Sequence, residues 1–153
     1  MTPAVPEPVA ALLRGGVRVD DDAQAFLFST VDGEGFPHVA LLSATELAVG
    51  LDGALLAAIA SPTTRANVKR TGVAALLAVE GDTAHALKLR VRRVVDVEDM
   101  LGAVLDVVSH RPDSLGIPLR PITFTATAEL RRLERWDITA RVLAALAEVR
   151  RQA

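Results

Sequence analysis

Cysteine and tyrosine are absent from this chain of 153 residues, and its aromatic side chains amount to four phenylalanines and one tryptophan. Without cysteine the protein has no disulfide, no thiol nucleophile and no thiolate ligand for a metal ion. The small number of aromatic side chains argues against a platform on which single-stranded nucleic acid stacks its bases. The net charge of −2 gives no general attraction to nucleic acid or to an anionic membrane.

Long hydrophobic runs are also missing. No uninterrupted apolar segment approaches the ~20 residues that cross a bilayer, and the N-terminus lacks the basic start and apolar centre of a secretory signal. We therefore expect a cytoplasmic protein with no membrane partner. The length favours one domain over residues 1–153, with an N-terminal helix and loop over 1–22 and a C-terminal helix over 137–151.

Catalytic and metal-binding patterns are scarce. The three histidines, His38, His85 and His110, are far apart in the sequence, so no metal site is predicted. No Gly-x-Ser-x-Gly segment and no recognisable Ser/His/acid set indicates a hydrolase. The acidic run Asp20–Asp22 is interpreted as a solvated turn or a helix cap.

Much of the chain has the pattern of antiparallel strands joined by short turns. Two strands, 25–31 and 36–43, flank Asp32-Gly-Glu-Gly35 and predict a hairpin. Further strands are predicted over 46–49, 54–60, 73–79, 83–95 and 121–131. In 83–95, His85, Leu87, Leu89 and Val91 share one face, whereas Lys88, Arg90 and Arg92 share the other. The Arg92-Arg93 step breaks this alternation and predicts a bulge.

Helices are predicted over 8–14, 62–71, 96–111 and 137–151. In the third, Asp96 is the cap, Met100, Leu101, Val104, Leu105 and Val108 form an apolar stripe, and His110 lies at the C-terminal end. In the last, Asp137 is the cap and Ile138, Val142, Leu146 and Val149 form the stripe, with Arg141, Glu148 and Arg150 exposed. The order of elements favours a mainly β fold built as a small antiparallel barrel rather than a parallel sheet.

The segment 60–69 is the candidate anion site, because it reads as a short helix with both ends marked. Ser61 is a good N-cap, Pro62 suits the first helical position and Gly72 suits the residue that ends the helix. Free N–H groups, the dipole and a guanidinium meet at the first turn, which favours a phosphate. The side chains concerned are Ser61, Thr63, Thr64 and Arg65, with Asn67 and Lys69 further along. An ordinary capped helix with a solvated cationic face is the alternative.

An ordered set of segments then points to a family. It comprises Phe26-Leu-Phe-Ser-Thr-Val-Asp-Gly-Glu-Gly-Phe-Pro-His38, a Leu-rich return strand, Ser61-Pro-Thr-Thr-Arg-Ala-Asn67, the strand 73–79 with its hairpin, and the cation-bearing strand that ends at Val95. Over residues 23–96 the chain resembles the pyridoxamine 5′-phosphate oxidase-like, FMN-binding split-barrel family. The resemblance implies a six-stranded antiparallel Greek-key split barrel with short helices.

The resemblance also implies a homodimer that holds FMN in a cleft between subunits and acts as an oxidoreductase on an unidentified small molecule. Ser61, Thr64, Arg65 and Asn67 fall where the family's Ser/Thr, basic residue and Asn recur. With Thr63, Lys69 and Lys88 they form the candidate cofactor-binding set. Pyridoxamine phosphate oxidase activity itself is not expected, because its substrate-phosphate residues have no counterparts that we can place.

Two alternatives stay open at this stage. The first is a barrel without a cofactor that acts as a dimeric binding or regulatory module, which the uncharged stretch 39–43 and the few aromatic residues favour. The second is a deazaflavin or a haem in the same cleft. The cationic row of Lys88, Arg90 and Arg92 is either part of a ligand site or an ordinary solvated strand face, and it is too short to indicate nucleic-acid binding.

Overall fold

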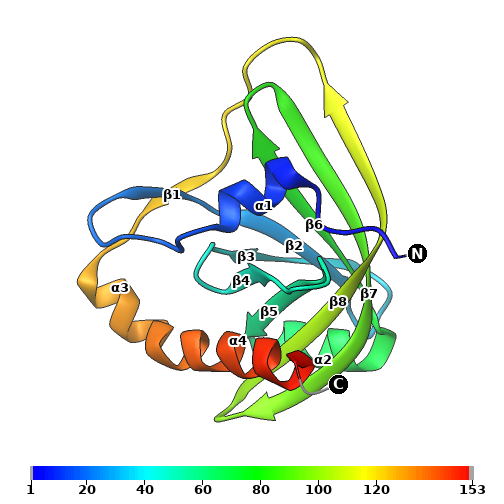
Figure 1. Ribbon diagram of the computed structural model, residues 1–153, viewed down its shortest axis with the longest axis vertical. Helices are drawn as coiled ribbons and strands as arrows, with labels where there is room; N and C mark the ends of the chain where they lie inside the picture. Colours follow the sequence, from blue (N-terminus) through cyan, green and yellow to red (C-terminus); the bar gives the residue numbers. More distant parts are fainter. Residues whose placement is uncertain (1, 152–153) are drawn as a thin grey trace.

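The computed structural model describes residues 2–151, with side chains in the last helix described as far as Ala147. A strongly curled antiparallel sheet dominates it, with helices at its ends and on its outside (Figure 1). The sheet contains β2 (Phe26–Val31), β3 (Pro37–Leu42), β4 (Leu47–Val49), β5 (Leu55–Ile59), β6 (Val73–Glu80), β7 (Thr83–Val97) and β8 (Met100–Ser114). A separate pair is formed by β1 (Asp22–Gln24) and β9 (Thr123–Thr125). The helices are α1 (Glu7–Leu13), α2 (Pro62–Thr71), α3 (Ala128–Leu133) and α4 (Trp136–Arg151).

The strand order, β3-β2-β6-β7-β8-β5-β4, places a central meander between two early hairpins. β2 and β3 form one edge, β4 and β5 form the other, and β6, β7 and β8 run between them. Because the end strands β3 and β4 do not pair with each other, the curled sheet is a split barrel rather than a closed one. The predicted mainly β split barrel with short helices is therefore confirmed, with seven strands in the main sheet instead of six.

The core has two layers. The larger layer fills the inside of the curl with side chains such as Phe26, Phe28 and Leu87. Helix α1 adds Val9 and Leu13 to it, and α2 adds Val68. The smaller layer lies behind β5 and β8, where Leu56, Met100 and Val104 pack against Val142 and Leu146 of α4. The inner face of the sheet thus packs on itself across the curl, and α4 covers part of the outer face (Figure 1).

The helix predicted over 96–111 is wrong, because this segment is the end of β7 and most of β8. Glu98 and Asp99, expected in a first helical turn, have φ of 47° and 65° and form the two-residue turn between the strands. Met100–Leu105 is buried on both faces, since Leu101, Ala103 and Leu105 face the inner core while Met100 and Val104 face α4. A strand buried on both sides has no alternation, and its apolar run fits a helical stripe equally well.

His110 consequently lies in a strand and does not end a helix. Its ring stacks on that of His85, with ring centroids 5.1 Å apart and Nδ1 of His85 2.9 Å from Nε2 of His110. Burial and the neighbouring His85 lower the pKa of His110 from its ordinary value. Among the described residues, no group of three or more His, Asp or Glu side chains could hold a metal ion.

The long strand predicted over 121–131 is also wrong. Only Thr123–Thr125 is extended and paired, with Ala23 opposite Phe124 in β1. Thr127 then caps α3, because its hydroxyl accepts a hydrogen bond from the Leu130 N–H at 3.0 Å. The alternation from Ile122 to Leu130 therefore spans a strand, a cap and a helical turn. A local cap overrides a periodicity of two when the next residues favour a helix.

Other predicted elements are confirmed. The helix over 62–71 has the predicted bounds, and β7 shows the predicted alternation, with Leu87 and Leu89 buried and Lys88 and Arg90 exposed. A register shift between Val91 and Arg93 confirms the bulge. The final helix is confirmed, with Val142 and Leu146 buried and Ile138 partly buried, but it begins at Trp136, so Asp137 lies in its first turn and the predicted Asp137 cap is wrong. The side chains of Glu148, Val149 and Arg150 lie outside the described part. No helix in the described part is long and apolar enough to cross a membrane.

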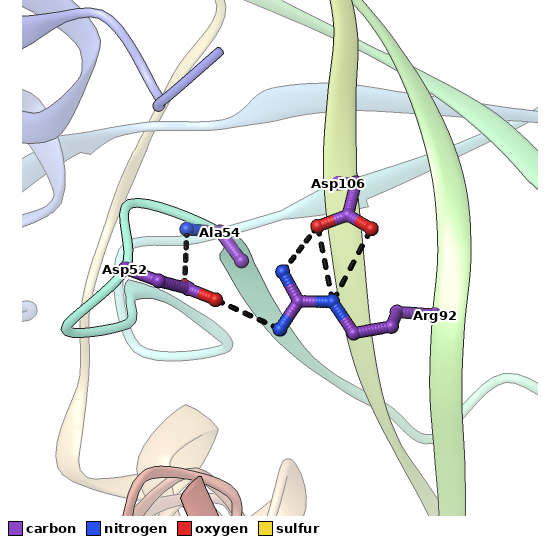
Figure 2. Close-up of polar contacts among 4 residues, drawn as sticks. All are labelled: Asp52, Ala54, Arg92 and Asp106. Carbon is purple, nitrogen blue, oxygen red and sulfur yellow. Dashed lines mark hydrogen bonds and ion pairs between the residues drawn. The ribbon is translucent and has the colours of Figure 1, made fainter. Parts of the chain in front are cut away.

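Arg92, one of the predicted cationic row, belongs to an ion-pair network inside the chain. Figure 2 shows its guanidinium between two carboxylates from different elements. Nη1 lies 2.8 Å from Oδ2 of Asp52, in the turn between β4 and β5, and Nε lies 3.1 Å from Oδ1 of Asp106 on β8. Asp52 also accepts the Ala54 N–H at 2.9 Å. The charge of Arg92 therefore holds a turn and two strands together.

Candidate functional site

The candidate anion site is the first turn of α2, which follows directly from the buried strand β5. The Ser61 hydroxyl accepts a long hydrogen bond, 3.4 Å, from the Thr64 N–H, and Pro62 occupies the first helical position. At the other end Gly72 has φ of 70°, and its N–H donates to the Val68 carbonyl at 2.9 Å. The sequence therefore fixes both ends of this helix locally.

Two polar atoms in this turn are buried without a hydrogen-bond partner, namely Oγ1 of Thr64 and Nε of Arg65. Thr64 is completely buried, whereas Ser61 and Thr63 are exposed and Arg65 is partly buried. Arg65 makes no ion pair with any described residue, unlike Lys69 and Arg92. Because buried polar atoms are nearly always paired in folded proteins, this turn is short of an acceptor, and an anion is the acceptor that a guanidinium prefers.

Asn67 faces the inside of the barrel. It is 2% exposed, its Nδ2 donates to Oγ1 of the buried Thr30 at 3.0 Å, and its Oδ1 accepts from Nη2 of Arg70 at 3.0 Å. Arg70 in turn donates to the carbonyl oxygen of Val31. The amide of Asn67 therefore fastens α2 to β2, and both of its ends are occupied.

The two predicted lysines lie away from the first turn. Nζ of Lys69 pairs with the Asp96 carboxylate at 2.9 and 3.0 Å. Lys88 is exposed on the outer face of β7, opposite Ala75 of β6 and Ser109 of β8. The structure therefore brings Ser61, Thr63, Thr64 and Arg65 together in one helical turn, and it places Asn67, Lys69 and Lys88 elsewhere.

One hollow begins next to this turn, and a second hollow shares part of its lining. The first, about 110 Å³, is lined by Ser61, by Ala58 and Ala60 around the end of β5, and by Leu41 of β3. The second, about 260 Å³, is lined by Leu41 as well and extends to Phe124 and Trp136. Glu46 and Glu134 line both hollows. The helix start therefore opens onto the first hollow, which shares part of its lining with the second at the β3 edge of the sheet.

Glu46 is a functional candidate that the sequence analysis missed. Its Oε2 accepts the Ser43 N–H at 2.6 Å, and the Ser43 hydroxyl accepts the Thr45 N–H at 3.1 Å. Burial raises the pKa of Glu46 to about 7, with a further rise from the Glu134 charge, against the lowering effect of the hydrogen bonds from Ser43. The Ser-x-x-Glu spacing of 43–46, typical of a reciprocal side-chain cap, was the signal available in the sequence.

An apolar patch covers the outer face of the sheet near the same edge. Strand register places Leu41, Leu27 and Leu77 in one row across β3, β2 and β6, and Val39, Ser29, Ala75 and Lys88 in the next row. Val39 is 50% exposed and Leu41 is 56% exposed, so large apolar side chains of the edge strand lie open to solvent. Contiguous exposed apolar side chains on an edge strand are typical of a surface that another chain covers.

Comparison with known proteins gives matches in structure only, since no family model and no curated protein sequence matches the chain. An F420 reductase superposes with a TM-score of 0.51 at 16% identity, covering 70% of this chain and 98% of its own. The flavin reductase of the styrene monooxygenase of Pseudomonas putida S12 gives 0.53 at 12% identity, covering 78% and 92%. The flavin reductase PheA2 gives 0.51 at 11% identity, covering 79% and 94%.

These matches extend over nearly the whole length of the solved proteins. The chain has the split-barrel fold of these solved proteins, which is the fold that the resemblance in the sequence implied. At such low identities the likeness establishes the fold, while ligand and reaction depend on this chain's own residues.

Proposed function

We propose that this protein is a flavin-binding oxidoreductase that holds FMN by its phosphate at the first turn of α2. The observation that supports the proposal is Arg65, a cation with a buried nitrogen that has neither a hydrogen bond nor an ion pair among the described residues. It lies at the positive end of a helix, beside the exposed hydroxyls of Ser61 and Thr63.

The other candidate residues take supporting roles in this proposal. Thr64 adds the unpartnered hydroxyl beneath the turn, and Asn67 keeps α2 in place through Thr30. Lys69 keeps its Asp96 partner and contributes only a distant positive charge. When bound, the flavin supplies the hydride chemistry, and the chain's own part is to bind and orient it.

The proposal includes a homodimer formed through the outer face of β2, β3 and β6. The exposed Val39 and Leu41 would be covered by the second subunit, and Lys88, which ends one of the rows on this face, would then lie at the interface. Burying the apolar face of an edge strand removes hydrophobic surface from water. We expect sedimentation equilibrium to give a dimer, and Leu41→Asp to convert it to a monomer.

The test compares FMN with riboflavin, which carries the same ring without the phosphate. Flavin-free protein is titrated with each, and binding is followed by quenching of flavin fluorescence. We expect FMN to bind more tightly than riboflavin, and Arg65→Ala to weaken FMN binding by roughly 10–100-fold, the value of one charge-assisted bond. Binding of riboflavin should not change. Arg132→Ala, which removes an exposed arginine of α3, is the matched control.

Equal affinity for FMN and riboflavin, or FMN binding that Arg65→Ala leaves intact, would refute the phosphate site. Binding of neither flavin would favour the cofactor-free binding or regulatory module. The structural likeness to an F420 reductase supports the alternative in which a deazaflavin is bound in place of FMN. The absorption spectrum of freshly purified protein distinguishes a deazaflavin from FMN.

A further inference from the structure

The larger hollow at the β3 edge of the sheet has the size and the lining of a small-molecule site. Its volume of about 260 Å³ is close to the lower end of the range for such pockets, ~300–1,000 Å³. Its walls come from β3, β9, α3 and the start of α4. Most lining side chains are apolar or aromatic, among them Leu41, Leu42, Ile122, Phe124, Leu130 and Trp136. Such a wall can bury the apolar body of a ligand, and its polar groups decide which kind of ligand fits.

Trp136 supplies a buried hydrogen-bond donor to this hollow. It is 5% exposed, it lines the hollow, and its buried indole Nε1 has no hydrogen-bond partner among the described residues. The N–H lies on the side of Glu46, since it is close enough to that carboxyl to lower its pKa slightly, although not in hydrogen-bonding geometry. Because buried N–H groups are nearly always paired, this donor indicates a ligand that offers it a lone pair.

Glu46 adds a second donor beside the first when its carboxyl group is protonated. Burial raises its pKa to about 7, against the lowering effect of the hydrogen bonds from Ser43, so about half of the molecules carry this proton at neutral pH. Its Oε2 already accepts the Ser43 N–H at 2.6 Å. In the protonated state an O–H and the Trp136 N–H therefore lie near each other on the same wall. Two neighbouring donors are the arrangement that holds a single acceptor oxygen.

The charges around the hollow favour a neutral ligand. The charged residues of its lining are both acidic, namely Glu46 and the exposed Glu134 at the end of α3, and no lysine or arginine lines the wall. An anion would be repelled by these carboxylates, and an ammonium has no lone pair for the Trp136 N–H. Further charged groups belong to a separate hollow that Trp136 also lines, namely Arg18, Arg131 and Asp137. A neutral molecule with an acceptor oxygen meets both conditions.

We propose that this hollow binds a small, neutral, apolar molecule that carries one carbonyl oxygen. The oxygen accepts hydrogen bonds from the Trp136 indole N–H and from the Glu46 carboxyl group, which its two lone pairs allow at once. The apolar body lies against Leu41, Ile122 and Phe124. The site is separate from the phosphate site at the first turn of α2, and its occupancy does not require a flavin. The inference therefore goes beyond the proposed function and can fail or hold without it.

Acetophenone is the probe, because it joins a phenyl ring to one carbonyl group. The matched control is α-methylstyrene, which has the same shape but a CH₂ group in place of the oxygen. Trp136 is the sole tryptophan, so an NMR spectrum of nitrogen-15-labelled, flavin-free protein contains a single indole N–H peak. At about pH 6 we expect acetophenone to bind at least ~10-fold more tightly than α-methylstyrene, which leaves both donors without a partner. Acetophenone should also move the indole proton downfield, as a new hydrogen bond does. Equal affinity for the two molecules, or an indole peak that responds equally to both, would overturn the proposal.

The pH dependence of binding reports the second donor. Only the protonated carboxyl group of Glu46 donates, and its carboxylate form repels a carbonyl oxygen. The apparent Kd of acetophenone should therefore rise by roughly tenfold between about pH 6 and about pH 8, as Glu46 loses its proton near a pKa of about 7. Acetophenone itself does not titrate over this range. An apparent Kd that is constant or falls with pH would contradict the proposal.

Variants, measured by calorimetric titration, complete the test. Trp136→Phe keeps most of the aromatic body without the N–H and should weaken acetophenone binding by at least ~10-fold, with little change for α-methylstyrene. Glu46→Gln keeps a donor that does not titrate, so it should retain binding at about pH 6 and abolish the pH dependence. Glu134→Gln, at an exposed position, should not affect a neutral ligand.

Full acetophenone binding by Trp136→Phe would sink the proposal. If that variant does not fold, Glu46→Gln decides, because a pH dependence that persists in it would show that Glu46 is not the second donor and would refute the two-donor site. Loss of FMN binding in the parent protein would leave the proposal standing, since all of these titrations use flavin-free protein.

Discussion

Replacing Gly102 with alanine tests the packing of α4 on β8. A Cβ at this position would come within 2.9 Å of Cγ1 of Val142, 3.1 Å of Cγ2 of Val95 and 3.3 Å of Cδ1 of Leu146. The first distance is shorter than real Cβ atoms show, so the Val142 side chain, α4 or β8 must shift. Overpacking of this kind costs about 1–3 kcal/mol of unfolding free energy. For a chain of this length, each kcal/mol lowers Tm by about 2–4 °C.

The sign of the effect decides between two structures for the same residues. If residues 96–111 were the exposed amphipathic helix that the sequence suggests, alanine in place of a helical glycine would raise stability by about 1 kcal/mol. In the strand it must lower stability. The assay is urea unfolding followed by circular dichroism, with Gly33→Ala as the control, because a Cβ at Gly33 would meet only Nη1 of Arg70, at 3.9 Å.

A second substitution should partly rescue the first. Val142→Ala alone should cost about 2 kcal/mol, through the loss of two buried methyl groups. In the double variant the alanine methyl at 102 occupies the space that the valine methyls leave. The loss of unfolding free energy in the double variant should therefore be at least about 1 kcal/mol smaller than the sum of the losses in the two single variants. An additive double variant, or a Gly102→Ala variant as stable as the parent, would refute the described contact between β8 and α4.

Three further perturbations follow from polar contacts. Because the folded-state pKa of Glu46 is raised from 4.5 to about 7, the contribution of Glu46 to stability should be greatest at low pH and fall by about 3 kcal/mol as pH rises between these values. Glu46→Gln should remove this contribution, which urea unfolding of both proteins at about pH 5 and about pH 8 would show. Arg92→Ala leaves two partly buried aspartates beside each other and should cost about 1–2 kcal/mol, with Arg92→Lys recovering only part of it, as thermal melts would show. Asn67→Ala should cost about 2 kcal/mol in flavin-free protein, measured by urea unfolding, because the buried threonine hydroxyl loses its partner; an effect seen only with FMN would instead make Asn67 a ligand.

The sequence predicts well those parts of the fold that local chemistry determines. The bounds of α2 follow from a cap, a proline and a C-terminal glycine, and the hairpin of β2 and β3 follows from Asp32-Gly-Glu-Gly35. The face pattern of β7 follows from alternation, because one side of that strand meets solvent. In each case the deciding interactions lie within a few residues of one another.

The errors lie where distant contacts decide. The apolar run Met100–Leu105 has no alternation because α4, about forty residues later, covers its outer face. The alternation of apolar and polar residues continues in the sequence to Arg131, but the helix cap at Thr127 ends the extended segment. A single sequence contains no sign of which later helix will cover a strand, so hydrophobic periodicity alone could not separate the two structures.

The candidate site shows the same division. Residue types at the start of α2 indicated an anion site. The sequence could not show which cations already have an anionic partner in the fold, because those partners lie far away in the sequence. Asp96 neutralises Lys69, and Asp52 and Asp106 neutralise Arg92. Arg65 keeps no carboxylate partner among the described residues, although it lies between the same two strands as Lys69. An arginine without an anionic partner among the described residues, at a helix start whose Ser61 lines a hollow, is a stronger reason to expect a bound phosphate than any residue pattern.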